Sequence, residues 1–358
     1  MRLPLFIIKF TNYEYWPWWL FYLPVLPYWL YLSIKNRSLA YFSVANPGIE
    51  LGGFFGESKS DILNLIDNAY LPKSIEVNDI NSADVLKFLQ EKNINYPLIA
   101  KPDVGERGNE VAKINNDEEL FRYNAGATYK YIIQEYISYE IELGVLYSRL
   151  PNSNKGKVTS ITLKEFLYIT GNGKSTILEL MQENTRARFQ IERLCKEMGD
   201  KIYTVLDKDE KIVLEPIGNH CRGTRFIDNN FLINEKLDTV FDKICLPIKG
   251  FYYGRFDLKV KCIEDLYKGE NIKIMELNGA SSEPGHIYDS TKSSLFRAYK
   301  DLLYHWKILA DVSKENIFKG YKPVPFLLIV KSYWSFVVFK KKKQKPRSSE
   351  PLYTNNCA

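Results

Sequence analysis

Two short segments of the chain hold the side-chain types that a magnesium–polyphosphate site requires. Arg255 and Asp257 lie two residues apart in the first segment, and Glu276 and Asn278 lie two residues apart in the second. Both segments have the composition of short strands, and because side chains alternate between the faces of a strand, each pair is expected to share one face. Magnesium prefers oxygen ligands, usually one or two carboxylates with phosphate oxygens and water. For either segment alone, an ordinary strand pair with a surface salt bridge is the alternative.

A lysine followed by a glycine-containing loop lies upstream of these segments. Lys101 ends the expected strand 98–101, and Gly105 and Gly108 follow it. Glycines let a backbone approach a phosphate closely with its N–H groups turned inward, and a lysine supplies a point charge. This is not the GxxxxGK[ST] loop of P-loop proteins, because the lysine precedes the glycines. The pattern indicates phosphate handling, with a plain surface turn as the alternative.

Amide and acidic side chains follow on the next expected strand and just beyond it. Gln134 and Glu135 lie on the expected strand 131–136, and Glu142, with Glu140 as its alternative, follows that strand. Carboxylates at strand ends in a nucleotide cleft typically hold ribose hydroxyls or the adenine amino group; solvent-facing acids are the alternative. Lys164 lies on a further expected strand, ahead of a glycine-containing loop that is either a phosphate flap or a hairpin turn.

The apolar spacing along the body of the chain predicts strands and helices without a regular βαβ alternation. The fold class expected from this mixture is α+β. The expected strands are 98–101, 131–136, 143–147, 158–163, 212–215, 253–257 and 272–278, and the expected helices are 59–68, 82–92, 175–181 and 185–198.

Taken in order, these pieces resemble the ATP-grasp superfamily, most nearly its D-alanine–D-alanine ligase-like branch. The resemblance runs from about Lys59 to about Asp289. It implies an ATP-grasp fold, in which two α+β subdomains clamp ATP, behind a reduced N-terminal region. It also implies site residues. These are Lys59, Lys101, Gly105, Gly108, Gln134, Glu135 and Glu142 for ATP, Asp257, Glu276 and Asn278 for metal, and Arg255 and Lys164 for catalysis.

The resemblance further implies an ATP-dependent carboxylate–amine ligase that uses Mg²⁺, with two ions and with Mn²⁺ as an alternative metal. A substrate carboxylate would be activated as an acyl phosphate, from which an amine would displace phosphate. An ATP-grasp phosphotransferase and a non-catalytic ATP-binding scaffold are the alternatives. The expected partners are small-molecule or peptide-like carboxylates and amines, including cell-envelope precursors. The residues leave the identity of both substrates and the oligomeric state open.

Side chains that suit substrate binding gather in the segment 215–225 and just after the second metal segment. The candidates are His220, Arg222, Arg225, Glu283 and His286. For the two histidines, a structural hydrogen-bonded role is the alternative. The segment 279–286 differs from the turn typical of D-alanine ligases, so the resemblance does not extend to D-alanine as substrate.

Composition narrows the class of protein. The 358 residues are 45% hydrophobic and 26% charged, as in a globular protein. The net charge is +6, and six basic residues between Lys340 and Arg347 account for it. The rest of the chain is electrically balanced, which gives no reason to expect nucleic acid as a partner. The number of cysteines is five, which is odd, and none of them has CxxC spacing. This argues against a disulfide framework or a zinc ribbon and favours a reducing compartment.

The two ends of the chain are apolar. The segment 15–34 is uncharged and rich in Trp and Tyr, which favour the membrane–water interface, and Pro17, Pro24 and Pro27 interrupt it as a helix. We expect an interfacial segment; a single span and a segment packed against the protein's own body are the alternatives. The segment 325–339 is also apolar and precedes the basic cluster, which suits an anionic cytoplasmic leaflet better than a solvated tail. The expected location is the cytoplasm, peripheral to the inner face of the membrane.

These patterns divide the chain into four parts. They are an aromatic-rich, membrane-interfacial segment at 1–38, a reduced N-terminal subdomain at 39–95, an ATP-grasp domain at 96–312, and an apolar and then polybasic tail at 313–358.

Overall fold

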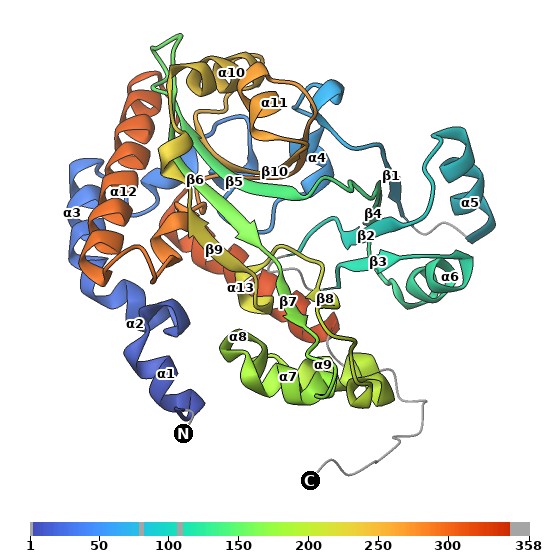
Figure 1. Ribbon diagram of the computed structural model, residues 1–358. Coiled ribbons are helices and arrows are strands. Elements are labelled where there is room, and N and C mark those ends of the chain that lie inside the picture. Colours follow the sequence, from blue (N-terminus) through green and yellow to red (C-terminus); the bar gives the residue numbers. More distant parts are fainter. Residues whose placement is uncertain (1–2, 79–81, 106–109, 344–358) are drawn as a thin grey trace.

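The computed structural model describes residues 3–78, 82–105 and 110–343. Helices combine with one four-stranded, one five-stranded and one two-stranded sheet in this part of the chain, and the paired strands are antiparallel. The predicted α+β fold class is therefore confirmed. Figure 1 shows the four-stranded sheet on the right, the five-stranded sheet in the middle and the two-stranded sheet below it.

The four-stranded sheet and two helices form the smaller α+β unit. Its strands are ordered β1-β4-β2-β3. The elements are β1 (Ser74–Val77), α5 (Ser82–Glu91), β2 (Leu98–Pro102), β3 (Ala112–Ile114), α6 (Asp117–Gly126) and β4 (Tyr131–Glu135). Val85 of α5 and Leu120 of α6 are buried in one apolar cluster with Leu98 and Ile133 of the sheet. This packing fixes β2 and β4, which carry the predicted ATP-side residues.

The five-stranded sheet carries the predicted metal and catalytic residues. Its strands are ordered β11-β10-β5-β6-β9. The elements are β5 (Ile141–Ser148), β6 (Lys157–Glu165), β9 (Arg225–Asp228), α10 (Glu235–Cys245), β10 (Tyr253–Val260), α11 (Ile263–Lys268) and β11 (Ile272–Asn278). Phe256 and Leu258 of β10 enter the main core together with Phe241 of α10. Alternation along β10 therefore turns Arg255 and Asp257 to the opposite face.

A small third unit follows β6. Strands β7 (Leu167–Thr170) and β8 (Lys211–Glu215) pair, and three short helices cover them. The helices are α7 (Ile177–Glu183), α8 (Thr185–Arg188) and α9 (Ile191–Met198). A capping box between Thr176 and Glu179 satisfies the free N–H groups at the start of α7. The segment 185–198, expected as one helix, forms two helices, α8 and α9.

The part 39–95 does not form one unit in the structure. Strand β1 pairs along its whole length with β4, so β1 and α5 belong to the smaller α+β unit. Residues Tyr41 and Ala45 instead pack against Leu146 and Tyr253 of the large sheet. At the other end, α12 (Leu295–Phe318) runs through the expected boundary at residue 312.

The N-terminal segment folds into three short helices, α1 (Leu5–Thr11), α2 (Trp18–Tyr22) and α3 (Leu26–Lys35). Phe21 and Val25 are buried against Ile287 and Leu302, the latter in α12. Figure 1 shows α3 and α12 side by side on one flank of the molecule. This contact corresponds to the alternative in which the segment packs on the protein's own body.

The other side of these helices faces outward. Trp18, Trp19 and Ile34 are exposed large apolar side chains. Helix α13 (Phe326–Lys343) follows α12 and has exposed apolar side chains as well. Across the described residues, no helix has both the length and the apolar character that crossing a membrane demands.

Candidate active site

The predicted metal residues are brought together by the pairing of β10 and β11. Arg255 lies opposite Asn278, and Asp257 lies opposite Glu276. Cross-strand partners have Cβ atoms about 5 Å apart, so all four side chains meet on one face. Arg255 donates to both carboxylate oxygens of Asp257, with Nε–Oδ1 at 2.8 Å and Nη2–Oδ2 at 3.2 Å. The shared faces predicted from alternation are therefore present.

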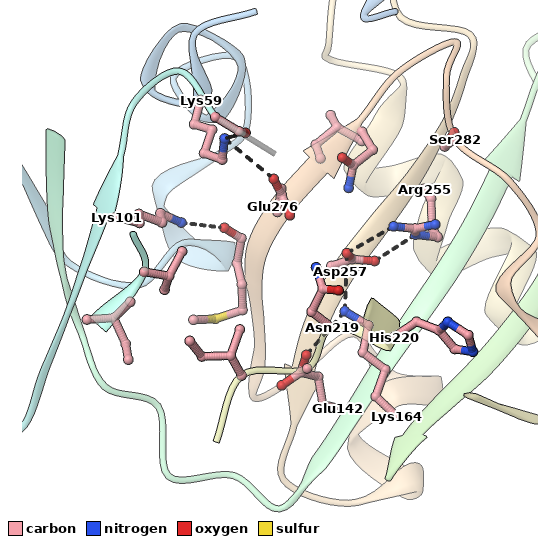
Figure 2. Close-up of a pocket in the computed structure, with 18 of the residues that line it drawn as sticks. Lys59, Lys101, Glu142, Lys164, Asn219, His220, Arg255, Asp257, Glu276 and Ser282 are labelled. Atoms are coloured by element: carbon pink, nitrogen blue, oxygen red, sulfur yellow. Dashed lines mark hydrogen bonds and ion pairs between the residues drawn. The ribbon is translucent and has the colours of Figure 1, made fainter. Parts of the chain in front are cut away.

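A buried lysine joins this cluster from β6. Lys164 Nζ lies 3.2 Å from Asp257 Oδ2 and 3.2 Å from Glu142 Oε1 (Figure 2). Burial alone would lower the pKa of Lys164, but the two carboxylates outweigh it and raise that pKa. Burial likewise acts against the charged form of Asp257, and Arg255 and Lys164 overcome it and lower the Asp257 pKa. Lys164, Arg255 and Asp257 therefore stay charged near neutral pH.

A second buried lysine approaches from the smaller unit. Lys101 of β2 donates to Met275 O at 2.9 Å and to Gln134 Oε1 at 3.2 Å. Burial lowers the pKa of Lys101 to about 8, although Glu276 acts in the opposite direction. A cation held with so few compensating contacts is suited to an anionic ligand.

Lys59 is a second lysine that lies near Glu276, beside Lys101. It begins the short helix α4 (Lys59–Leu63), which Ser58 caps through its side chain. Its Nζ donates to Gly105 O and lies 3.9 Å from Glu276 Oε1. Figure 2 shows Lys59 and Lys101 reaching toward Glu276 from one side, with Arg255 and Asp257 on the other. Gly108, the second predicted loop glycine, lies outside the described residues.

These groups surround one cavity of about 550 Å³ between the smaller unit and the large sheet. Its wall includes most of the residues predicted from the sequence. These are Lys59, Lys101, Gly105, Gln134, Glu142, Lys164, His220, Arg255, Asp257, Glu276, Asn278 and Glu283. A loop that carries Phe54 and Phe55 also lines the cavity. That loop lies close to the end of β11 because Gly53 has no side chain. A Cβ atom at Gly53, whose φ is 76°, would lie only 2.7 Å from the Cα atom of Gly279.

The donor set fits a magnesium ion. Two carboxylates and one amide lie on one face, and phosphate oxygens and water normally complete such a site. The Nδ2 atom of Asn278 is buried without a hydrogen-bond partner, so it could donate to a phosphate oxygen, whereas a metal would be bound through the Oδ1 atom of this amide. Within the described residues no three His, Cys, Asp or Glu side chains form a metal cluster. A set of two carboxylates and an amide would depend on the nucleotide for its remaining ligands.

Four predicted residues lie away from the cavity wall. Arg222 pairs with Glu215 at 2.6 Å, and Arg225 donates to Thr291 at 3.0 Å. His286 is 2% exposed and contacts Ser160 Oγ at 2.7 Å and Asp301 at 3.2 Å. The structural alternative is therefore the one observed for His286. Glu135 accepts from the Lys73 N–H instead of facing the cavity, and we assign none of these four a direct ligand contact.

Glu283 and His220 do line the cavity, in different ways. Tyr288 donates to Glu283 Oε2 at 2.6 Å, and Arg255 donates to the Glu283 carbonyl at 3.3 Å. Burial raises the pKa of Glu283 to about 7, which makes it a group able to exchange a proton near neutral pH. The His220 ring points away from Lys164 and Asp257 in Figure 2.

The sequence interpretation missed two residues. Lys259 lines the cavity two positions after Asp257 on β10, and its Nζ donates to Ile137 O at 3.0 Å. The same alternation that predicted Asp257 would have found it. Glu14, in the N-terminal segment, is buried beside Arg186 and lies 3.1 Å from His220 Nε2. No local pattern indicates a contact between residues so far apart in the chain.

Comparison with known proteins finds ligases to which the chain is similar. No family model matches it. The coenzyme gamma-F420-2:alpha-L-glutamate ligase of Methanococcus maripaludis is 36% identical over 70 residues, which are 19% of this chain and 24% of that ligase. The match thus spans about a quarter of the relative's length.

Solved structures of two further ligases are similar to the chain. VanG D-Ala:D-Ser ligase from Enterococcus faecalis is 15% identical, with a TM-score of 0.40 and with 70% of this chain and 61% of that chain covered. D-alanine–D-alanine ligase from Bacillus anthracis is 17% identical, with a TM-score of 0.38 and with 74% and 67% covered. The predicted resemblance to the ATP-grasp ligases is confirmed.

Proposed function

We propose that the chain is an ATP-dependent carboxylate–amine ligase. The observation that supports this most directly is the arrangement of charges around the cavity. Lys59 of α4 and Lys101 of the smaller unit line one side, while Arg255, Asp257 and Glu276 line the large-sheet side. Cations that face a carboxylate pair across a cavity are what a metal-bound polyphosphate requires.

In this proposal ATP lies between the two units. Lys59 and Lys101 neutralise phosphate oxygens, and Gln134 and Glu142 hold the nucleoside end. Asp257, Glu276 and Asn278 would hold Mg²⁺, and the bound metal would supply positive charge against the triphosphate.

The chain's own residues account for the charge changes of the proposed reaction. A substrate carboxylate is phosphorylated by ATP to an acyl phosphate, and Arg255 stabilises the negative charge that develops during the transfer. Lys164 holds Asp257 and Glu142 in place through its two ion pairs. An amine then attacks the acyl carbon and phosphate leaves. Glu283, with a pKa of about 7, accepts the proton that the amine loses.

The substrates in this proposal are small-molecule or peptide-like, and a cell-envelope precursor suits the apolar surfaces near the cavity. The exposed apolar side chains of α2, α3 and α13 support the proposal that the protein binds the cytoplasmic surface of a membrane. The free thiols of Cys195, Cys221, Cys245 and Cys262 are compatible with a reducing compartment.

An ADP-release screen tests the proposed function. Purified protein is given Mg-ATP with pooled carboxylates, with and without pooled amines. We expect ADP and phosphate only when both pools are present, and Asp257→Asn and Glu276→Gln should each abolish it. Glu264→Gln, at an exposed position on α11, is the matched control and should keep full activity. ADP release that needs no amine would instead indicate a phosphotransferase, and activity retained in both metal-site variants would refute the site assignment.

A further inference from the structure

Helix α13 presents an apolar face to solvent, although Ile329 anchors the helix to the body. Ile329 is 5% exposed and packs in the same apolar cluster as Leu32 of α3. By contrast Leu327 is 81% exposed and Trp334 is 61% exposed. These two residues are seven apart and so lie on one side of the helix. An exposed apolar face of this kind marks an interaction surface.

The flank of α13 next to this face reaches the rim of the cavity. The ring of Tyr333 in α13 meets the ring of Phe55 edge-on, with 5.8 Å between their centroids. Phe55 and its neighbour Phe54 line the cavity. Whatever covers the outer face of α13 is therefore close to the cavity opening.

The charged residues in the sequence of α13 and at the end of α3 are basic. Helix α13 contains no acidic residue, Lys331 is exposed on it, and the helix ends in the run Lys340–Lys343. Lys35 and Arg37, at the end of α3, are also exposed. Trp and Tyr beside a run of lysines are typical of a helix that lies in the interface of an anionic bilayer.

We infer that α13 docks on an anionic bilayer through the face that carries Leu327 and Trp334, and that this holds the cavity rim at Phe54 and Phe55 against the lipid surface. The inference rests on the proposed function only for the role of the cavity. It adds which surface makes the membrane contact and where the cavity opens. A ligase with this orientation takes one substrate from the lipid surface.

Flotation with vesicles tests the docking face. The full chain is mixed, without ATP, with vesicles of equal parts phosphatidylglycerol and phosphatidylcholine, or of phosphatidylcholine alone. We expect flotation with the anionic vesicles, and about tenfold less for the double variant Leu327→Glu, Trp334→Glu. Phe231→Glu, at a side chain that is 76% exposed elsewhere, is the matched control and should float like the wild type.

Hydrogen–deuterium exchange of the wild-type chain provides a second measurement that needs no variant to fold. Anionic vesicles should slow exchange in 52–57 and 326–335 and leave 229–233 unchanged. Wild-type protein that does not float, equal flotation of the double variant, or protection confined to other segments would each overturn the inference. A dimer that the double variant dissociates, without flotation, would assign the face to a second copy and overturn it too. Because no ATP is present, these outcomes are independent of the ligase test.

Discussion

Several charged side chains of the cavity are buried, and each is compensated differently. Arg255, Asp257, Lys164 and Glu142 form one connected set of ion pairs. Among the described residues, no carboxylate lies within salt-bridge distance of Lys101, which donates to a carbonyl and an amide oxygen. The first set is satisfied without a ligand, whereas Lys101 gains most from one. This difference makes Lys101 the most sensitive reporter of nucleotide binding.

The lowered pKa of Lys101 predicts how ATP affinity depends on pH. Its pKa of about 8 lies below the ordinary value, so the side chain loses its charge as pH rises through 8. ATP affinity should therefore fall by about tenfold between pH 7 and pH 9. Titration calorimetry across this range measures it and should also show proton uptake on binding near pH 8.5.

Two variants make this prediction specific. Lys101→Gln should bind ATP weakly and with no dependence on pH in this range. Lys87→Gln, at an exposed position on α5, should behave like the wild type. An unchanged pH dependence in Lys101→Gln would show that another group titrates.

The raised pKa of Glu283 predicts the pH dependence of the amine step. Burial raises this pKa to about 7, so the carboxylate that accepts a proton forms as pH rises through 7. The turnover rate should increase over this range, and Glu283→Gln should lower it by roughly a hundredfold and remove the increase. A pH–rate profile at saturating ATP and substrates measures both effects. A profile of unchanged shape in the variant would exclude Glu283 as the base.

At the scale of elements, strand alternation was the most informative sequence pattern. It predicted that Arg255 and Asp257 share a face, and the β10–β11 register then places Glu276 and Asn278 directly opposite them. Loop residues were less predictable, because their direction depends on packing. Arg222 and Arg225 were predicted to bind substrate, but in the structure Arg222 pairs with Glu215 and Arg225 donates to Thr291.

The contact between the N-terminal segment and the body includes one buried carboxylate. Glu14 is 6% exposed, Arg186 and His220 pair with it, and Ser290 donates to it at 3.1 Å. Burial opposes its ionisation, but His220 and Arg186 hold the Glu14 pKa below its ordinary value. The ionised carboxylate therefore stabilises the fold above about pH 4.5, and this contribution is lost as pH falls through the lowered pKa.

Glu14→Gln should lower the free energy of unfolding by about 1–3 kcal/mol at pH 7, because it leaves Arg186 without its partner. Urea unfolding at pH 7 and at pH 4 measures this, and the difference from the wild type should be smaller at pH 4. Glu192→Gln removes an exposed pair with Lys196 and should cost no more than about 0.5 kcal/mol. Equal stability of Glu14→Gln and the wild type would argue against the network.

At the scale of the whole molecule, the cavity exists only because separate units face each other. Lys101 belongs to the four-stranded sheet, and Asp257 belongs to the five-stranded sheet. The loop with Phe54 and Phe55 connects this cavity to the apolar face of α13. Substrate choice is therefore a property of the assembled chain.

An apolar chain on the substrate should improve turnover if the cavity opens at a lipid surface. For whichever carboxylate or amine supports ADP release, we expect a long-chain form in anionic vesicles to have at least about a tenfold higher kcat/KM than the short-chain form with the same headgroup. Leu327→Glu should remove this advantage and leave turnover of the short-chain form unchanged. Equal kcat/KM for the two forms would contradict the expectation.

The sequence by itself determined the α+β class and the shared faces of Arg255 with Asp257 and of Glu276 with Asn278, because these follow from local composition and from the two-residue period of a strand. Only the tertiary structure decided which of the other polar residues reach the cavity. It buried His286 beside Ser160, turned Arg222 and Arg225 into ion pairs and hydrogen bonds elsewhere, and brought Glu14 to His220. These contacts join residues far apart in the chain, and their geometry depends on how the sheets and helices pack, which no local pattern encodes.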